Sequence, residues 1–229
     1  RRHTRFRNVT GVQTCALPIC PNGAGKTTLF NLLNGIIPPN AGQIRFDARD
    51  VTGLRPNQLC RLGMARTFQV ARPFPRMTVL ENVVVGAIAA TDDAHQTQQS
   101  AHEALHRVGL AHRALAHVDT LTNLELRLLE LARALASRPK LVLLDETLAG
   151  LGGSEVEEML RVIQQLPAFG VTVVIIEHTM HAMTRLADRF LVLDHGRLIA
   201  QGKPDEVMRV PTVIDAYLGN KWEIGRAHV

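Results

Sequence analysis

The chain has 229 residues, of which 46% are hydrophobic and 21% are charged, so it is long and apolar enough to bury a sizeable core. Three cysteines are too few for a disulfide framework and suit a reducing cytosol. No apolar run approaches the roughly 18 residues that are needed to cross a bilayer, so we expect any membrane association to be peripheral.

The two ends of the chain differ from the rest. Residues 9–19, VTGVQTCALPI, resemble the translation of a common sequencing adapter, and residues 1–5 resemble the matching amplification primer. Residues 224–229 resemble the opposite strand of the adapter, after a junction codon for Glu223. We therefore expect residues 1–19 and 223–229 to be adapter-derived, and the native N-terminal strands to be missing.

This interpretation changes the meaning of the net charge of +5. The two ends hold five of the 26 basic residues and one of the 21 acidic residues, which leaves 21 and 20, a net charge of +1. Charge therefore gives no support for a nucleic-acid partner. A targeting peptide is the alternative for residues 1–19, but no apolar core of sufficient length follows the arginines.

A phosphate-binding loop follows at residues 20–28. It matches the pattern G-x-x-x-x-G-K-[ST] except that Cys20 stands in place of the first glycine, as expected if the adapter replaced one base of a glycine codon. In such a loop, backbone N–H groups surround the phosphates, Lys26 reaches the β- and γ-phosphates and Thr27 ligates Mg²⁺. The alternative is a flexible surface turn. We expect the nucleotide to contact Asn22, Gly23, Ala24, Gly25, Lys26, Thr27 and Thr28.

The middle of the chain has helical character. Residues 70–139 are rich in Ala, His and Leu, and the leucines at 124, 128, 131 and 135 fall on one helical face. We expect a helical subdomain inserted between two parts of an α/β core, residues 20–69 and 140–222. The polar stretch 91–100 is predicted to be a solvated loop, and the scattered histidines of this region do not indicate a metal site.

Two strands are expected to end in polar residues that face a nucleotide. Residues 141–144 are apolar and precede Asp145 and Glu146, so Asp145 is placed to hold Mg²⁺ and Glu146 to activate water as a general base. The alternative is a surface acidic pair after a core strand.

The second such strand covers residues 171–176, and Glu177 and His178 follow it. His178 is a candidate hydrogen-bond partner of the γ-phosphate and the attacking water, although a lone histidine after a strand is often structural. Gln69 lies where the core gives way to the helical insertion, and its amide is a candidate ligand of the metal. A hairpin is predicted at residues 190–201, with His195 and Gly196 in the turn.

Together these motifs resemble the nucleotide-binding domain of ATP-binding cassette (ABC) transporters, over residues 20 to about 219. The segments Arg66 to Gln69, Met77 to Val83 and Val213 to Gly219 look like the ATPases of branched-chain amino-acid importers. The resemblance implies a P-loop NTPase fold of RecA-like type, with a mainly parallel sheet and an inserted helical subdomain. It also implies an ATPase that uses ATP and Mg²⁺ and powers uptake of branched-chain amino acids or a similar solute.

The sequence departs from the family at the signature Leu-Ser-Gly-Gly-Gln, which contacts the γ-phosphate held by a partner cassette. Here it is Leu121 followed by Thr122, Asn123, Leu124 and Glu125. Leu124 replaces a glycine, and Glu125 adds negative charge near phosphate. Gly152 stands where an Asp or Asn normally links the two sites, and Thr147 where the family often has Pro. The aromatic residue that stacks on adenine also precedes the loop in the family, and adapter sequence occupies that place.

These departures favour a heterodimer in which a second ABC ATPase supplies the better signature. The resemblance further implies integral-membrane permease subunits, indirect contact with a solute-binding protein outside the membrane, and a peripheral location on the cytoplasmic face of the membrane. Alternatives are the ATPase of a lipid or lipopolysaccharide exporter, a soluble ABC protein of DNA repair or translation, and a non-hydrolysing regulatory cassette.

Overall fold

The computed structural model describes residues 14–17, 24–68 and 73–218. Its main sheet has six strands in the order β4-β5-β6-β1-β7-β8, all parallel to their neighbours except the antiparallel pair β7–β8. The strands are β1 (Thr14–Leu17), β4 (Met64–Arg66), β5 (Leu141–Asp145), β6 (Thr172–Ile176), β7 (Arg189–Asp194) and β8 (Arg197–Gly202). A separate antiparallel ribbon pairs β2 (Arg45–Phe46) with β3 (Arg49–Asp50).

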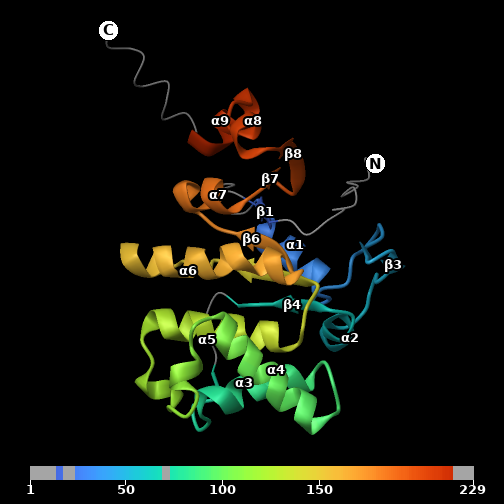
Figure 1. Cartoon of the computed structure of the whole chain (residues 1–229). Helices are drawn as coiled ribbons and strands as arrows, with labels where there is room; N and C mark the ends of the chain where they lie inside the picture. Colours follow the sequence, from blue (N-terminus) through green and yellow to red (C-terminus); the bar gives the residue numbers. More distant parts are fainter. Residues whose placement is uncertain (1–13, 18–23, 69–72, 219–229) are drawn as a thin grey trace.

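Helices surround this sheet (Figure 1). They are α1 (Lys26–Leu33), α2 (Pro56–Arg61), α3 (Val79–Ile88), α4 (Ala94–Arg107), α5 (Asn123–Ala136), α6 (Gly153–Gln165), α7 (Met180–Leu186), α8 (Pro204–Val207) and α9 (Pro211–Leu218). Short 3₁₀ turns cover Ala111–Arg113 (η1), Val118–Thr120 (η2) and Leu166–Phe169 (η3). The mainly parallel sheet with helices confirms the predicted P-loop NTPase class.

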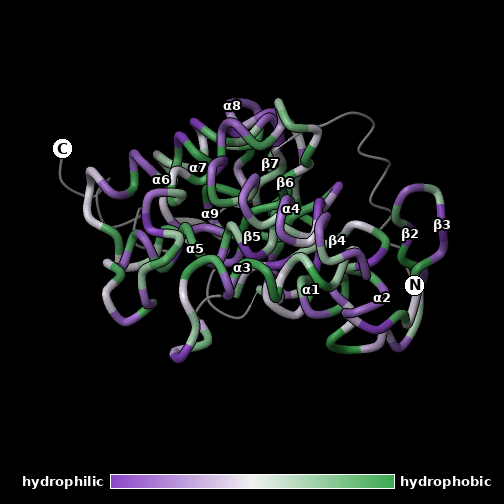
Figure 2. Tube along the Cα trace, turned by 60° about the horizontal axis from the view of Figure 1, so that its bottom comes forward, coloured by the Kyte–Doolittle hydropathy of each residue, from purple (hydrophilic) through white to green (hydrophobic). Residues whose placement is uncertain are grey.

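The core forms because the central strands are apolar on both faces, as in a sheet covered by helices on each side. Val142, Leu143 and Leu144 of β5 are fully buried, as are Val173 and Ile175 of β6. Figure 2 shows hydrophobic stretches along β5 and β6 inside the molecule and hydrophilic stretches in many outer segments. The predicted hairpin is confirmed by β7 and β8, which pair across the turn at His195 and Gly196.

A strand leads into the phosphate-binding loop, although the native N-terminal strands were expected to be missing. Thr14–Leu17 form β1, which lies between β6 and β7 and pairs in parallel with both. Cys15 and Ala16 are 1% and 0% exposed. The residues Thr-Cys-Ala-Leu are small or apolar, which is sufficient for a central strand because its two neighbours provide the hydrogen-bonding partners. The adapter origin of the codons stays a prediction.

The three longer helices between β4 and β5 pack on one another and gather on one side of the sheet (Figure 1). Within residues 73–139, which are described without a gap, α3, α4, α5, η1 and η2 alternate with loops. Gly86 of α3 permits the close approach of α5, because a Cβ there would lie 2.2 Å from the carbonyl oxygen of Arg133. The predicted apolar face of α5 is confirmed, since Leu124, Leu128, Leu131 and Leu135 are all buried.

The prediction of a loop over residues 91–100 is wrong for most of that stretch, because α4 begins at Ala94. The carboxylate of Asp93 caps the helix by accepting a hydrogen bond from the backbone N–H of Gln96 at 2.8 Å. Thr97 and Ser100 are polar but buried, since small side chains allow α4 to pack closely on its neighbours. The polar composition of residues 91–100 therefore did not indicate the amphipathic helix that begins there.

Candidate functional site

The candidate site lies where three neighbouring parallel strands end at the same level. In the register of the sheet, Ile176 of β6 lies opposite both Leu17 of β1 and Asp145 of β5. The three strands therefore end at one edge of the sheet, where open α/β folds bind ligands. Residues 24–28 of the phosphate-binding loop lie beside Glu146 and His178 at this edge.

The second half of the loop leads directly into α1. Gly25 caps the helix in a left-handed conformation with φ 93°, which a glycine adopts without steric cost. Its carbonyl accepts the N–H of Leu29 at 2.8 Å. The first N–H groups of α1 and the helix dipole form an anion-binding end, and Lys26 at the first helical position is 7% exposed. Asn22 and Gly23 lie outside the described residues.

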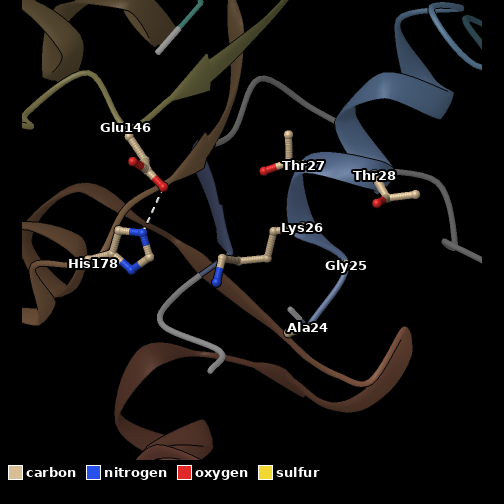
Figure 3. A pocket seen from close by; sticks show the side chains of 7 residues that line it. All are labelled: Ala24, Gly25, Lys26, Thr27, Thr28, Glu146 and His178. Carbon is tan, nitrogen blue, oxygen red and sulfur yellow. Dashed lines mark hydrogen bonds and ion pairs between the residues drawn. The ribbon is translucent and has the colours of Figure 1, made fainter. Parts of the chain in front are cut away.

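A cavity of about 200 Å³ opens at this edge and is lined by Ala24, Gly25, Lys26, Thr27, Thr28, Glu146 and His178. Figure 3 shows the side chains of Glu146 and His178 on one side and the start of α1 on the other, with Lys26 extending into the space between them. All seven lining residues are among those predicted from the sequence. The structure thus brings the predicted loop residues together with the predicted acid and histidine.

Glu146 and His178 form a hydrogen-bonded pair, with 2.7 Å between His178 Nε2 and Glu146 Oε1. Glu146 has φ 50°, a left-handed conformation that costs a non-glycine residue about 1–3 kcal/mol and is frequent in active sites. The backbone N–H of Glu146 donates to the carbonyl of Ile176 at 2.9 Å, which fixes this conformation against β6. The carboxylate is therefore aimed into the cavity by a constrained backbone.

Asp145 is not among the lining residues of the cavity and is only 4% exposed. Its Oδ2 atom accepts a hydrogen bond from Arg66 Nη2 at 2.8 Å. Asp145 and Thr27 both offer oxygen atoms, which are the donors that Mg²⁺ prefers, so the donor set fits the predicted ion. The third predicted ligand, Gln69, lies outside the described residues.

Glu177 connects the end of β6 with the loop after Glu146. Its Oε1 atom accepts the backbone N–H of Leu148 at 2.7 Å, and its Oε2 atom accepts the N–H of His178 at 3.3 Å. Burial raises the pKa of the Glu177 carboxyl, and these two N–H donors act in the opposite direction. The carboxylate thus holds the Glu146 loop and the His178 loop together.

The segment that replaces the family's signature begins α5 and does not line the cavity. Thr122 and Glu125 form a capping box, in which Glu125 N–H donates to Thr122 Oγ1 at 3.2 Å and Thr122 N–H donates to Glu125 Oε2 at 2.8 Å. Asn123 Nδ2 donates to the carbonyl of Gly150 at 2.9 Å. The start of α5 is therefore tied to the loop that follows Glu146.

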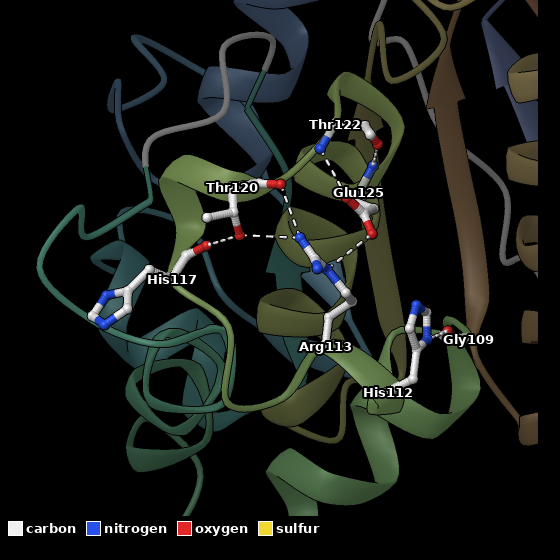
Figure 4. A network of polar contacts seen from close by, with 7 residues as sticks. All are labelled: Gly109, His112, Arg113, His117, Thr120, Thr122 and Glu125. Carbon is white, nitrogen blue, oxygen red and sulfur yellow. Dashed lines mark hydrogen bonds and ion pairs between the residues drawn. The ribbon is translucent and has the colours of Figure 1, made fainter.

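The negative charge of Glu125 faces a cation. Arg113 Nε lies 3.2 Å from Glu125 Oε1, and Arg113 Nη2 donates to Thr120 at 2.8 Å (carbonyl) and 3.0 Å (Oγ1) (Figure 4). Leu124, which replaces a glycine of the family pattern, is 8% exposed. The charge of Glu125 is thus partly balanced by a neighbouring guanidinium that the sequence prediction did not include.

Sequence reasoning assigned no role to Arg66, Arg113 or Glu177, whose side chains make polar contacts with residues of the predicted site. Arg66 and Glu177 each adjoin a predicted motif, and a charged residue at the end of a buried strand could have indicated them. Arg113 gave no such signal, because it lies 12 residues before Glu125 in a segment without a motif.

A family model described as "ABC transporter" matches residues 14–149, and a second described as "Branched-chain amino acid ATP-binding cassette transporter" matches residues 197–222. The branched-chain amino acid transport ATP-binding proteins LivG of Salmonella typhimurium and BraF of Pseudomonas aeruginosa are each 36% identical over 217 residues, covering 88% of this chain and 85% of the relative.

A solved structure of an ATP-binding cassette is also similar to this chain. The ADP conformation of MJ1267, an ATP-binding cassette of an ABC transporter, matches with a TM-score of 0.80 and 29% identity, over 91% of this chain and 88% of that one. The family match includes β1, which agrees with its place in the sheet. By its sequence, its fold and the residues around its phosphate-binding loop, the chain belongs to the ABC transporter family of ATP-binding proteins.

Proposed function

We propose that this chain is the ATP-hydrolysing subunit of an importer for branched-chain amino acids. The observation that carries the proposal is the placement of Glu146 and His178 across one cavity from Lys26 and Thr27. The solute class is supported by the printed names of the relatives LivG and BraF and by the family match at residues 197–222.

In the proposed mechanism, the N–H groups at the start of α1 and the ammonium group of Lys26 bind the phosphates of ATP. Mg²⁺ would be held by Thr27, Asp145 and Gln69, and when bound with ATP it neutralises charge on the β- and γ-phosphates. Glu146 accepts a proton from the attacking water, and His178 positions the Glu146 carboxylate through their hydrogen bond. Glu146 has a second carboxylate oxygen, so it can hold water and His178 together.

Two cassettes act together in this proposal, and Thr122, Asn123, Leu124 and Glu125 face the γ-phosphate held by the partner. Because Leu124 and Glu125 depart from the family pattern, the partner is a second, different cassette. In the proposed assembly, the chain lies on the cytoplasmic face of the membrane. It acts together with integral-membrane permease subunits and, indirectly, with a solute-binding protein outside the membrane. No helix among the described residues is long and apolar enough to cross a membrane. The division into a core (20–69 and 140–222) and a helical subdomain (70–139) is also proposed, with β1 added to the core.

Leucine uptake tests the transport role. The chain replaces LivG in Escherichia coli cells that lack it, and uptake of radiolabelled leucine is compared with that of cells carrying Glu146→Gln. Uptake that depends on Glu146 supports the proposal. A chain that assembles with the remaining subunits and hydrolyses ATP there without any leucine uptake contradicts the solute class.

Sedimentation of the purified Glu146→Gln variant with ATP tests the heterodimer. We expect the variant to stay monomeric when it is alone. A stable ATP-dependent homodimer contradicts the proposal of a second, different cassette.

A further inference from the structure

Arg66 joins three elements beneath the candidate site. It is the last residue of β4, its Nη2 atom donates to Asp145 Oδ2 at 2.8 Å, and its Nη1 atom donates to Asn31 Oδ1 at 2.7 Å. Asp145 is the last residue of β5, and Asn31 lies on α1. The side chains of Arg66 and Asp145 are 5% and 6% exposed, so water contributes little to the solvation of either charge.

Aromatic rings complete the surroundings of the guanidinium. Its central carbon lies 5.5 Å from the ring centre of Phe30 and 5.3 Å from that of Phe68, within the range of cation–π attraction. The Nε atom is buried without a hydrogen-bond partner, so the two terminal nitrogens provide the polar contacts described. Arginine suits this position because its planar group can donate from two nitrogens at fixed angles.

We propose that Arg66 is a positioning residue that orients the Asp145 carboxylate toward Mg²⁺. This inference rests on the proposed function. A buried carboxylate needs a partner for its charge, and the one supplied here binds Oδ2 from the side of β4. A carboxylate offers about four lone-pair positions on two oxygens, so contact with Arg66 is compatible with a bound ion or its water.

The link to Asn31 extends this role to the phosphate-binding helix. Asn31 lies five residues after Lys26 on α1, and Arg66 therefore connects the helix that binds phosphate to the strand that ends in Asp145. Partners of metal ligands fix the orientation of those ligands, and their loss commonly lowers metal affinity by about 10- to 100-fold. Arg66 acts through Asp145 and is not a catalytic residue.

The test uses the whole chain and its Arg66→Gln variant, with Mn²⁺ as a paramagnetic replacement for Mg²⁺. Mn²⁺ is titrated into protein saturated with a non-hydrolysable ATP analogue, and the protein-bound ion is measured by water-proton relaxation. We expect the half-saturating Mn²⁺ concentration to rise by about 10- to 100-fold. The Kd of the analogue in EDTA should stay within about twofold, because Arg66 does not line the phosphate cavity.

Arg133→Gln is the matched control, since Arg133 also pairs with a carboxylate and lies over a phenylalanine ring. Arg66→Lys, which keeps the charge but not the two-nitrogen geometry, should give an intermediate Mn²⁺ affinity. If Arg66→Gln does not fold, Asn31→Ala removes one anchor of Arg66 and should raise the half-saturating Mn²⁺ concentration by a smaller factor.

Unchanged Mn²⁺ affinity in a folded Arg66→Gln protein would overturn the proposal, as would an equal loss in Arg133→Gln. Tighter Mn²⁺ binding by Arg66→Gln would overturn it too, because Arg66 would then compete with the ion. Failure of the unsubstituted chain to bind the analogue, with or without Mn²⁺, would instead contradict the proposed function itself.

Discussion

Replacing Arg113 with glutamine removes the cation that faces Glu125 at the start of α5. The two side chains are 30% and 20% exposed, so their ion pair is only partly screened by water and contributes about 0.5–1 kcal/mol to the free energy of unfolding. Arg113 also donates two hydrogen bonds to Thr120, each with a net contribution of about 0.5–1.5 kcal/mol before exposure reduces it. We expect Arg113→Gln to lower the free energy of unfolding by about 1–2 kcal/mol.

Glu125→Gln should cost about 0.5–1 kcal/mol, the contribution of the lost ion pair with Arg113, because a glutamine still completes a capping box with Thr122. Urea unfolding followed by circular dichroism gives the free energies of the parent, both single variants and the double variant. The expected coupling between Arg113 and Glu125 is about 0.5–1 kcal/mol and should decrease in high salt.

Arg185 and Glu157, an ion pair that is 36% and 47% exposed, supply the matched control cycle. Their coupling should be smaller because both side chains are more exposed. Additive effects of the Arg113 and Glu125 substitutions, within about 0.2 kcal/mol, would refute the view that Arg113 compensates the charge of Glu125.

Three further outcomes are expected. Lys26→Ala should weaken ATP binding by about 10- to 150-fold in a calorimetric titration, because it removes a charged donor to phosphate; unchanged affinity would contradict its role. Leu131→Ala should lower the free energy of unfolding by about 2–5 kcal/mol in urea, since Leu131 is 0% exposed. Burial raises the pKa of Glu177 above its ordinary value of 4.5. The folded protein therefore holds this proton more tightly than the unfolded chain, and the contribution of Glu177 to stability falls as pH rises from 4.5 through the raised pKa. The Glu177→Gln variant lacks this decline, so its free energy of unfolding relative to that of the parent should rise as pH rises from 4.5. Parallel profiles of unfolding free energy against pH for the two proteins would contradict the raised pKa of Glu177.

Much of the sheet edge was predictable from sequence because its motifs are local. The loop from Ala24 to Thr28 is contiguous, and apolar runs identified β5 and β6 with Glu146 and His178 just beyond them. Parallel strands bring such ends together whatever their separation in the chain. Local pattern and the expected parallel sheet were therefore sufficient to predict the residues that line the cavity.

Contacts between distant residues could not be predicted in this way. Arg66 and Asp145 are 79 residues apart, and no spacing rule relates the end of β4 to the end of β5. The strand β1 was not predicted for another reason. Residues 14–17 resemble translated adapter sequence, and they were therefore not expected to form part of the fold. A central strand needs backbone partners and apolar side chains, and Thr-Cys-Ala-Leu meets both requirements.

The most direct test of the account is the rate of phosphate release from Mg-ATP by the transporter in which the chain replaces LivG, compared with the same transporter carrying Glu146→Gln, at equal nucleotide occupancy. We expect hydrolysis by the parent and a loss of about 100-fold or more in the variant, with ATP binding retained, because a general base typically contributes a factor of 10²–10⁴. Equal hydrolysis by both proteins would show that Glu146 does not activate water, and the proposed catalytic site would be wrong.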